Sequence, residues 1–268
     1  MVEFKDIAAI RIAKGRMDMS QSVEADNVAL PKGDTACGVD AAELVARARS
    51  LVSTLREREA KAILDRQVPQ ETIAAFQDAG FFKILQSQRY GGYEMSPSVY
   101  CDVAKTLAEG CMGSAWVYGV IAVHNWQLAL FDPQAAEDVW GKDNSVLISS
   151  SYMPTGKATK IDGGYRFSGR WAFSSGSAHC SWVILGANMV AEDGDGKPEP
   201  YNFLLPRSDY DIVDTWNVMG LCPTGSNDIV VEDVFVPDHR VLRERDMFNL
   251  DCPGHALNTA PLYSIPFA

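Results

Sequence analysis

Apolar positions in the first half of the chain recur at the spacing of helices. Asp40 with Glu43 three positions later resembles a capping box, which marks the start of a helix. The apolar residues that follow lie three or four positions apart along one face: Leu44, Val45, Ala48, Leu51, Val52 and Leu55. This pattern predicts an amphipathic helix from residue 40 onward.

Four further helices are predicted before residue 144. Pro69 suits a first helical turn and Gly80 suits the position after a last turn, so they bound a second helix. Ser96-Pro97 opens a third helix, which runs toward Gly110. The fourth, over 113–131, is apolar almost all round and is therefore expected to be buried. The fifth is short and begins at Asp132-Pro133.

The second half of the chain has the residue pattern of β-strands. Short β-branched or aromatic segments alternate there with turn residues, over 146–152, 165–173, 182–187, 202–205 and 229–236. Asp162-Gly163-Gly164 predicts a tight hairpin turn and 192–200 a longer exposed loop. Helices followed by strands predict an α+β architecture, with an antiparallel sheet, barrel or sandwich in the second half. We expect an N-terminal extension over 1–36, a helical domain over 37–144 and a β domain over 145–247.

Composition and charge narrow the class of protein. The 268 residues can bury a sizeable core, and 47% apolar with 22% charged residues is typical of a globular chain. The net charge of −11 disfavours binding to nucleic acid or to an anionic membrane surface. The longest apolar stretch, 115–123, is too short to span a bilayer, and residues 1–15 do not resemble a secretory signal. We therefore expect a cytoplasmic protein.

The cysteines suggest no metal site. Six are scattered along the sequence with no two closer than ten positions, so zinc-binding and CxxC spacings are absent. We expect reduced thiols and no bound metal ion. Common catalytic signatures such as GxSxG, a Walker loop, GxGxxG after a strand and HExxH are absent as well.

The first candidate functional residues lie on the apolar helix predicted over 113–131. Trp116, Val120 and His124 follow at four-residue steps, which places Trp116 and His124 about 80° apart around the helix axis. A histidine here is either a hydrogen-bonded core residue or a general base in a dry pocket.

Two strand segments add candidates. Ser149-Ser150-Ser151 ends an apolar run, where hydroxyls either satisfy the backbone or face a ligand. In 167–176 aromatic residues alternate with small ones, and the segment closes on Ser174-Ser175-Gly176. Such a strand either packs its rings into the core or receives a flat aromatic cofactor.

The order of these elements resembles a known family. A helical half is followed by a small β half, by the element Gly169-Arg170-Trp171-Ala172-Phe173-Ser174-Ser175-Gly176, and by the run from Met219 to Asp228 that leads into Val234-Phe235-Val236-Pro237. Over residues 40–268 this resembles the acyl-CoA dehydrogenase fold. Within that fold it is most similar to the oxygenase components of two-component flavin-dependent aromatic hydroxylases, of the p-hydroxyphenylacetate and secosteroid hydroxylase type.

The resemblance implies roles for individual residues. His124 matches the histidine that meets the substrate phenol, and Ser150 matches a serine that faces the same hydroxyl. Ser175 matches the serine that hydrogen-bonds near flavin N5. The positions that the resemblance places beside the flavin are Trp116, Phe173, Ser174, Ser175 and, more weakly, Trp171.

The resemblance also implies an activity and partners. The expected reaction is hydroxylation of a phenolic or other aromatic substrate by O2 and reduced FMN or FAD, through a C4a-hydroperoxyflavin. A separate NAD(P)H-dependent flavin reductase would supply the reduced flavin. The resemblance also implies a homo-oligomer, which in this family is a tetramer. The alternatives are an acyl-CoA dehydrogenase-like flavoprotein and a truncated, non-catalytic assembly subunit.

Two departures from the family pattern stand out. Family members have a C-terminal helical domain, so residues 248–268 are expected to be only its start. Cys222-Pro223 occupies positions where an arginine and a small residue are expected, which removes a positive charge from that loop.

Overall fold

The computed structural model describes residues 35–36, 38–190 and 196–265. The predicted N-terminal extension lies outside this part of the chain apart from Thr35 and Ala36, and the predicted loop over 192–200 lies partly outside it. The described residues all belong to one compact unit. The division into a helical domain and a β domain stays a prediction from the sequence.

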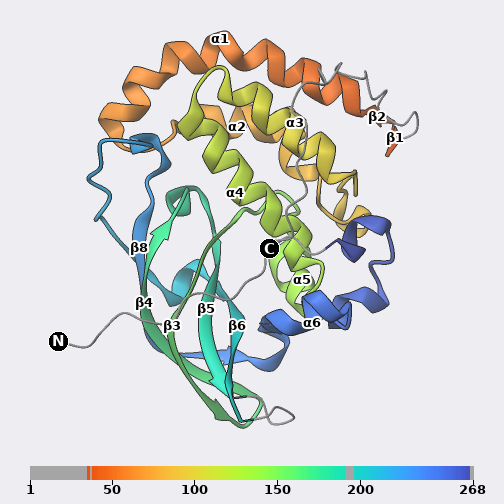
Figure 1. Cartoon of the computed structure of the whole chain (residues 1–268), viewed down its shortest axis with the longest axis vertical. Coiled ribbons are helices and arrows are strands. Elements are labelled where there is room, and N and C mark those ends of the chain that lie inside the picture. The colour runs from red at the N-terminus through yellow and green to blue at the C-terminus, as the bar shows by residue number, and fades with distance from the viewer. Residues whose placement is uncertain (1–34, 37, 191–195, 266–268) are drawn as a thin grey trace, which may run out of the picture. The chain divides into compact units, whose positions relative to one another are not determined.

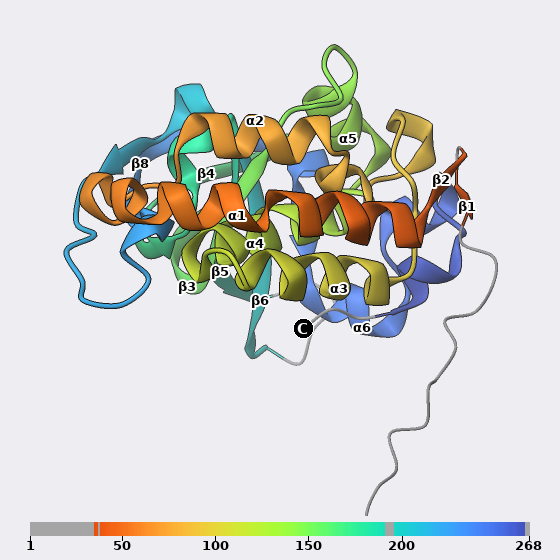
Figure 2. The same cartoon turned by 90° about the horizontal axis from the view of Figure 1, so that it is seen from above.

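All five predicted helices are present, and they lie together on one side of the sheet (Figure 1). Their order along the chain matches the prediction, and a further short helix follows the sheet. The helices are α1 Ala41–Asp65, α2 Gln70–Asp78, α3 Pro97–Ala108, α4 Met112–Leu128, α5 Pro133–Trp140 and α6 Glu244–Asn249. Seen from above, α1 and α3 run beside each other across the molecule (Figure 2).

Local capping signals explain where these helices begin. The Asp40 carboxylate accepts a hydrogen bond from the backbone N–H of Ala42 at 3.2 Å, which caps α1. Asp132 caps α5 in the same way through Gln134 N–H at 2.9 Å. Ser96 caps α3, and a proline occupies the first helical position that follows it.

The strands form a seven-stranded sheet in the order β7-β8-β4-β3-β5-β6-β9. Their bounds are β3 Ile148–Ile161, β4 Gly164–Ser174, β5 Trp182–Val190, β6 Pro198–Pro206, β7 Asp211–Val213, β8 Asn227–Pro237 and β9 Val241–Arg243. The short strands β1 Thr35–Ala36 and β2 Val39–Asp40 pair separately before α1. The sequence pattern predicts neither these two strands nor β7 and β9.

The expectation of a purely antiparallel sheet is wrong for one pair of strands. β3 and β4 form the predicted hairpin around Gly163, but β5 then pairs parallel to β3 on its other edge. A parallel pair needs a crossover connection, and here β4 and the turn after it supply one. The sheet is therefore mixed.

Two apolar cores hold the molecule together. The larger one lies between the helices and one face of the sheet, where Ile148, Ile184 and Leu204 meet the helices. The smaller one lies between the two halves of the sheet, where the rings of Phe167 and Phe203 stack with centroids 4.2 Å apart. The sheet thus bends around a core of its own, as in a sandwich.

The helix α4 is buried on most of its surface and contacts both α3 and β3. It is apolar nearly all round, as the sequence predicts. Within the described residues, no helix combines the length and the apolar character that a membrane span requires.

Candidate active site

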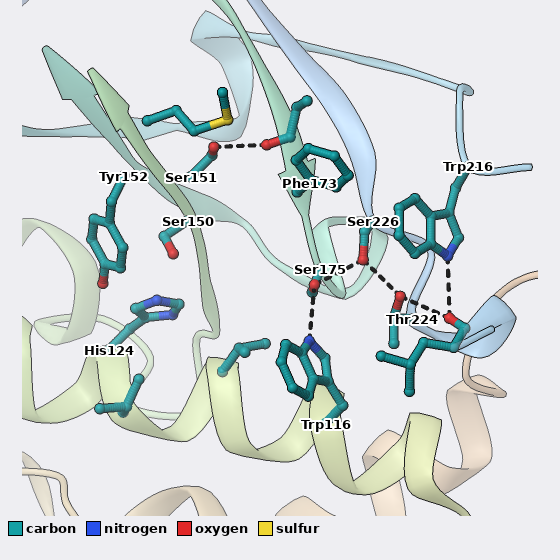
Figure 3. A pocket seen from close by; sticks show the side chains of 15 residues that line it. Trp116, His124, Ser150, Ser151, Tyr152, Phe173, Ser175, Trp216, Thr224 and Ser226 are labelled. Atoms are coloured by element: carbon teal, nitrogen blue, oxygen red, sulfur yellow. Dashed lines mark hydrogen bonds between the residues drawn. The ribbon is translucent and has the colours of Figure 1, made fainter. Parts of the chain in front are cut away.

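A cavity of about 510 Å³ lies between α4, the start of β3, the end of β4 and the loop that leads into β8 (Figure 3). Its walls are mainly apolar and aromatic, with hydroxyl groups and one histidine among them. The lining residues are Trp116, Val120, Val123, His124, Ser150, Ser151, Tyr152, Met153, Ala172, Phe173, Ser175, Trp216, Leu221, Thr224 and Ser226. Such a mixture of apolar surface and a few placed polar groups is typical of a ligand site.

His124 occupies the buried end of the cavity. Its side chain is 1% exposed, and its Nδ1 lies 2.8 Å from the backbone carbonyl oxygen of Ile148. Because a carbonyl oxygen only accepts, Nδ1 carries the proton and donates. Burial lowers the pKa of His124 to about 4, so the ring is neutral at pH 7 and Nε2 holds a lone pair.

Ser150 and Tyr152 lie beside this histidine on β3. Figure 3 shows the Ser150 hydroxyl directed toward the His124 ring. The rings of His124 and Tyr152 meet edge to face with centroids 6.0 Å apart, and the Tyr152 hydroxyl donates to Gln127 Oε1. The buried end of the cavity therefore combines one neutral imidazole with two hydroxyl groups.

Ser175 belongs to a row of hydroxyl groups at the open end, which we call the hydroxyl relay (Ser175, Ser226 and Thr224). The indole Nε1–H of Trp116 donates to Ser175 Oγ at 3.2 Å. Ser175 Oγ lies 2.8 Å from Ser226 Oγ, and Ser226 Oγ lies 2.6 Å from Thr224 Oγ1. The relay ends where Thr224 Oγ1 donates to the carbonyl oxygen of Leu221 at 3.0 Å.

Phe173 brings a second aromatic ring to the open end. Its ring is 63% exposed and meets the Trp216 ring edge to face, with centroids 6.0 Å apart. Its backbone has φ of 65°, a left-handed conformation that is costly for a residue with a bulky side chain. In this backbone conformation the ring forms part of the cavity wall.

Trp171 and Ser174 are not among the residues that line the cavity, although the family resemblance implies them as flavin contacts. Trp171 is fully buried in the core of the sheet, where its Nε1–H donates to the Gly186 carbonyl at 2.8 Å. Ser174 is fully buried as well. The register between β4 and β8 shifts between Trp171 and Ser174, so the alternation of side chains breaks just there.

The structure therefore brings together Trp116, His124, Ser150, Phe173 and Ser175 in one cavity. Sequence reasoning missed four polar or aromatic residues of its wall: Tyr152, Trp216, Thr224 and Ser226. Thr224 and Ser226 lie inside the run from Met219 to Asp228 that carries the family resemblance, and this was the one available signal for them.

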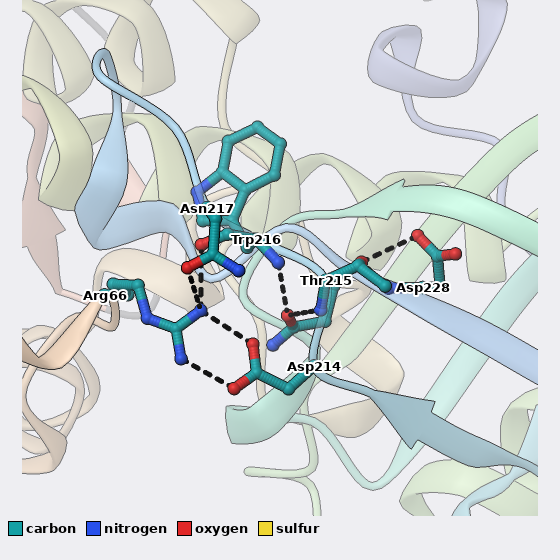
Figure 4. A network of polar contacts seen from close by, with 7 residues as sticks. Arg66, Asp214, Thr215, Trp216, Asn217 and Asp228 are labelled. Carbon is teal, nitrogen blue, oxygen red and sulfur yellow. Dashed lines mark hydrogen bonds and ion pairs between the residues drawn. The ribbon is translucent and has the colours of Figure 1, made fainter.

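The loop that supplies Trp216 is fastened to the end of α1 (Figure 4). Arg66, at the left-handed C-cap of α1, donates to both carboxylate oxygens of Asp214 at 2.6 and 2.7 Å and to the Trp216 carbonyl at 3.0 Å. Asn227 Oδ1 accepts from the backbone N–H groups of Thr215 and Trp216. This wall of the cavity is thus held by an ion pair and by backbone hydrogen bonds.

The unusual Cys222 lies in the same loop. Its thiol donates to the Val218 carbonyl at 2.9 Å, so it closes the turn before the short helical turn Cys222–Thr224. The cysteines of the described residues are free thiols, as expected; Cys37 lies outside these residues.

Comparisons with known proteins agree with this fold and cavity. Residues 40–135 match the family model of the acyl-CoA dehydrogenase N-terminal domain. The oxygenase subunit HsaA of a flavin-dependent monooxygenase from Rhodococcus jostii is 48% identical over 222 residues, which cover 82% of this chain and 57% of that protein. The oxygenase component of an FADH2-dependent resorcinol hydroxylase from a Rhizobium species is 36% identical over 211 residues, or 79% of this chain and 51% of that protein.

A solved structure supports the same grouping. The crystal structure of a 3-HSA hydroxylase from Rhodococcus sp. RHA1 superposes with a TM-score of 0.80 at 48% identity, covering 84% of this chain and 58% of that one. The chain thus spans somewhat more than half the length of these relatives. Sequence and fold together confirm the resemblance: this chain belongs with the oxygenase components of flavin-dependent monooxygenases that have the acyl-CoA dehydrogenase fold.

Proposed function

We propose that the protein hydroxylates a phenolic or other aromatic substrate with O2 and reduced flavin. The observation that carries this proposal is the pairing, within one cavity, of a neutral buried imidazole with an aromatic surface that bears hydroxyl groups. The neutral imidazole suits a phenol, and the aromatic surface suits a flat cofactor.

His124 acts as the proton acceptor for the substrate. Its Nδ1–H bond to Ile148 fixes the tautomer and leaves the Nε2 lone pair free for a phenol hydroxyl. Ser150, whose hydroxyl is directed toward the same ring, orients that phenol (Figure 3). Removing the phenol proton makes the ring more electron-rich and so more reactive toward an oxygen electrophile.

The open end of the cavity fits a flavin ring. Trp116, Phe173 and Trp216 offer aromatic surface there, and Ser175 offers a hydroxyl oxygen. When bound, reduced flavin supplies the activation of O2. The residues of this chain hold the ring, and the apolar wall excludes water from its reactive side.

We propose two kinds of partner for the protein, a flavin reductase and further copies of the same chain. A separate NAD(P)H-dependent reductase supplies reduced FMN or FAD, and the enzyme works as a homo-oligomer in the cytoplasm. The relatives named above, as oxygenase components or subunits, support the division of labour with a reductase.

The experiment is an anaerobic titration of the 268-residue chain with reduced FMN and then reduced FAD, followed by addition of O2 and a phenol. We expect saturable binding and a hydroxylated product, with little hydrogen peroxide released. The comparison variant is His124→Gln, which leaves a polar amide of similar length in the cavity but no base. Binding without product in the parent chain would contradict the role in hydroxylation, and no binding would contradict the flavin site.

A further inference from the structure

Arg66 occupies a backbone position that favours glycine. It is the C-cap of α1 with φ of 53°, and its backbone N–H donates to the carbonyl oxygens of Ala62 and Ile63. Helices often place glycine at a left-handed position of this kind, because a side chain is disfavoured there. An arginine at such a position indicates that its side chain contributes something that glycine cannot.

The Arg66 guanidinium contacts three residues of the loop between β7 and β8 (Figure 4). Nη2 donates to Asp214 Oδ2 at 2.6 Å, and Nη1 lies 2.7 Å from the other carboxylate oxygen. Nη1 also lies 3.0 Å from the Trp216 carbonyl oxygen and 3.2 Å from Asn217 Oδ1. Because the group is planar and its two bonds to the carboxylate are parallel, the pairing fixes orientation as well as distance.

Side-chain packing does little to hold this loop. Over 214–221 every side chain is exposed except that of Trp216, which is partly buried. A loop with few buried apolar contacts depends on polar contacts for its position. On the side of β8, Asn227 Oδ1 accepts from the backbone N–H groups of Thr215 and Trp216 at 3.1 and 3.2 Å. On the side of α1, Arg66 holds the Trp216 carbonyl.

Trp216 connects this tether to the cavity. Its ring lines the open end and meets the Phe173 ring edge to face. Its indole N–H donates to the Leu221 carbonyl at 3.2 Å. With its carbonyl held by Arg66 and its indole by Leu221, the residue is restricted in both place and tilt against Phe173.

We propose that Arg66 is a positioning residue that acts through Trp216 and sets how tightly the open end of the cavity binds a flat ring. Arg66 is not itself among the residues that line the cavity. The inference rests on the proposed function, which places the flavin against Trp116, Phe173 and Trp216.

The alternative is that Arg66 serves only the stability of the fold. The side chains of Arg66 and Asp214 are 36% and 64% exposed, and exposed ion pairs contribute little to the free energy of unfolding. Their main effect is therefore expected on the conformation of the loop. The two roles predict different results when binding and unfolding are measured on the same variant.

The test measures the dissociation constants of reduced FMN and reduced FAD by anaerobic titration, together with the midpoint of urea unfolding. Arg66→Gly removes the guanidinium but suits the left-handed backbone, so the midpoint should stay close to that of the parent chain. Without the tether we expect the loop to keep its binding conformation for about a fifth of the time, which raises the dissociation constants about fivefold. Asp214→Asn, which leaves Arg66 in place, should shift them in the same direction.

Leu250→Gly is the matched control. Leu250 is the C-cap of α6 with φ of 57°, so it also places a side chain at a left-handed helix end. Its replacement introduces the same backbone change without removing a tether, and Leu250 is not among the residues that line the cavity. The dissociation constants should equal those of the parent chain.

A double-mutant cycle tests whether the effect passes through Trp216. Trp216→Leu removes the ring through which Arg66 is proposed to act. In that background, Arg66→Gly should change the dissociation constants by no more than about twofold. Near-ultraviolet circular dichroism adds a readout without flavin: the signal that Trp216→Leu removes from the parent chain should be weaker in Arg66→Gly, because the indole is then less restricted.

The outcomes are distinguishable. Unchanged dissociation constants in Arg66→Gly, or a fivefold rise that persists in the Trp216→Leu background, would overturn the positioning role and leave the proposed function standing. Failure of the parent chain to bind either reduced flavin would overturn the proposed function, and the role of Arg66 with it.

Discussion

The two ends of the cavity differ in the kind of group they present. The inner end, at His124 and Ser150, holds a titratable ring that is 1% exposed. The outer end, at Trp116, Phe173 and Ser175, presents rings that are 48% and 63% exposed together with a hydroxyl that bonds to Trp116 and Ser226. Yet Trp116 and His124 lie on the same helix. One helix, α4, thus contributes to a buried end, where the proposed function places proton transfer, and to an open end, where it places the flavin.

The largest effect is expected at the inner end. His124→Gln leaves an amide of similar length in place of the imidazole, and among the described residues of the cavity wall no other imidazole remains. The loss of a positioned general base predicts a hydroxylation rate about 100- to 10,000-fold lower, measured as product formed per turnover of reduced flavin. Flavin affinity should not change, because the outer end is untouched.

His239→Gln serves as the control for this substitution. His239 bonds to Asp138 away from the cavity, so its replacement should leave the rate unaltered. An equal loss of flavin affinity in His124→Gln would break the separation between the two ends.

The inner end should also reveal itself in the pH dependence of stability. Burial lowers the pKa of His124 from 6.5 to about 4, so the unfolded chain binds a proton more readily than the folded one. Above pH 6.5 the ring is neutral in both states, and the free energy of unfolding keeps its full value. As the pH falls from 6.5 toward 4, stability is lost because the unfolded chain takes up the proton first. The difference of about 2.5 in pKa corresponds to about 3 kcal/mol.

The measurement is urea unfolding of the parent chain and of His124→Gln at several pH values between 4 and 7. The free energy of unfolding of the parent should fall more steeply toward low pH than that of the variant. Parallel curves would mean that His124 is not buried in its neutral form.

At the outer end, Ser175→Ala should weaken reduced flavin binding without affecting proton transfer. Loss of one hydrogen-bonding hydroxyl predicts a dissociation constant about fivefold larger, measured by anaerobic titration. Ser208→Ala removes a hydroxyl that donates to Asp209 on the surface, and it should leave the constant unchanged. A normal constant in Ser175→Ala would remove this residue from the flavin-binding surface.

The smallest effect concerns the backbone of Phe173. Phe173→Gly and Phe173→Ala both remove the ring, but only glycine adopts the φ of 65° without strain. The glycine variant should therefore be more stable than the alanine variant by about 1 kcal/mol in thermal or urea unfolding, while both bind flavin more weakly. Equal stabilities would show that the conformation of Phe173 costs nothing.

The sequence predicts most of the fold because its signals are local. Asp40 and Asp132 cap their helices through neighbouring N–H groups, and Gly163 turns the hairpin that its dipeptide predicts. The parallel pairing of β3 and β5 has no such signal, because it depends on which edge of β3 is free after β4 has paired. The position of His124 is equally local, since the helical period alone places it on the same broad face of α4 as Trp116.

The outer site is harder to predict for a physical reason. Alternation along a strand would place Trp171 and Phe173 on one face, but the register shift sends Trp171 into the core and turns Phe173 to the cavity. Ser226 and Thr224 join Ser175 from a distant loop, and only tertiary structure brings their hydroxyls within hydrogen-bond distance.

The fastening of the Trp216 loop to α1 has a consequence for local unfolding. Arg66 joins the last turn of α1 to Asp214 and to the Trp216 carbonyl, so this wall of the cavity is not an independent lid. Opening the loop would break the hydrogen bonds of Arg66 at the end of α1. In a hydrogen-exchange experiment, the amide of Trp216, which donates to Asn227, should therefore exchange together with the C-terminal amides of α1 rather than with those of a surface loop.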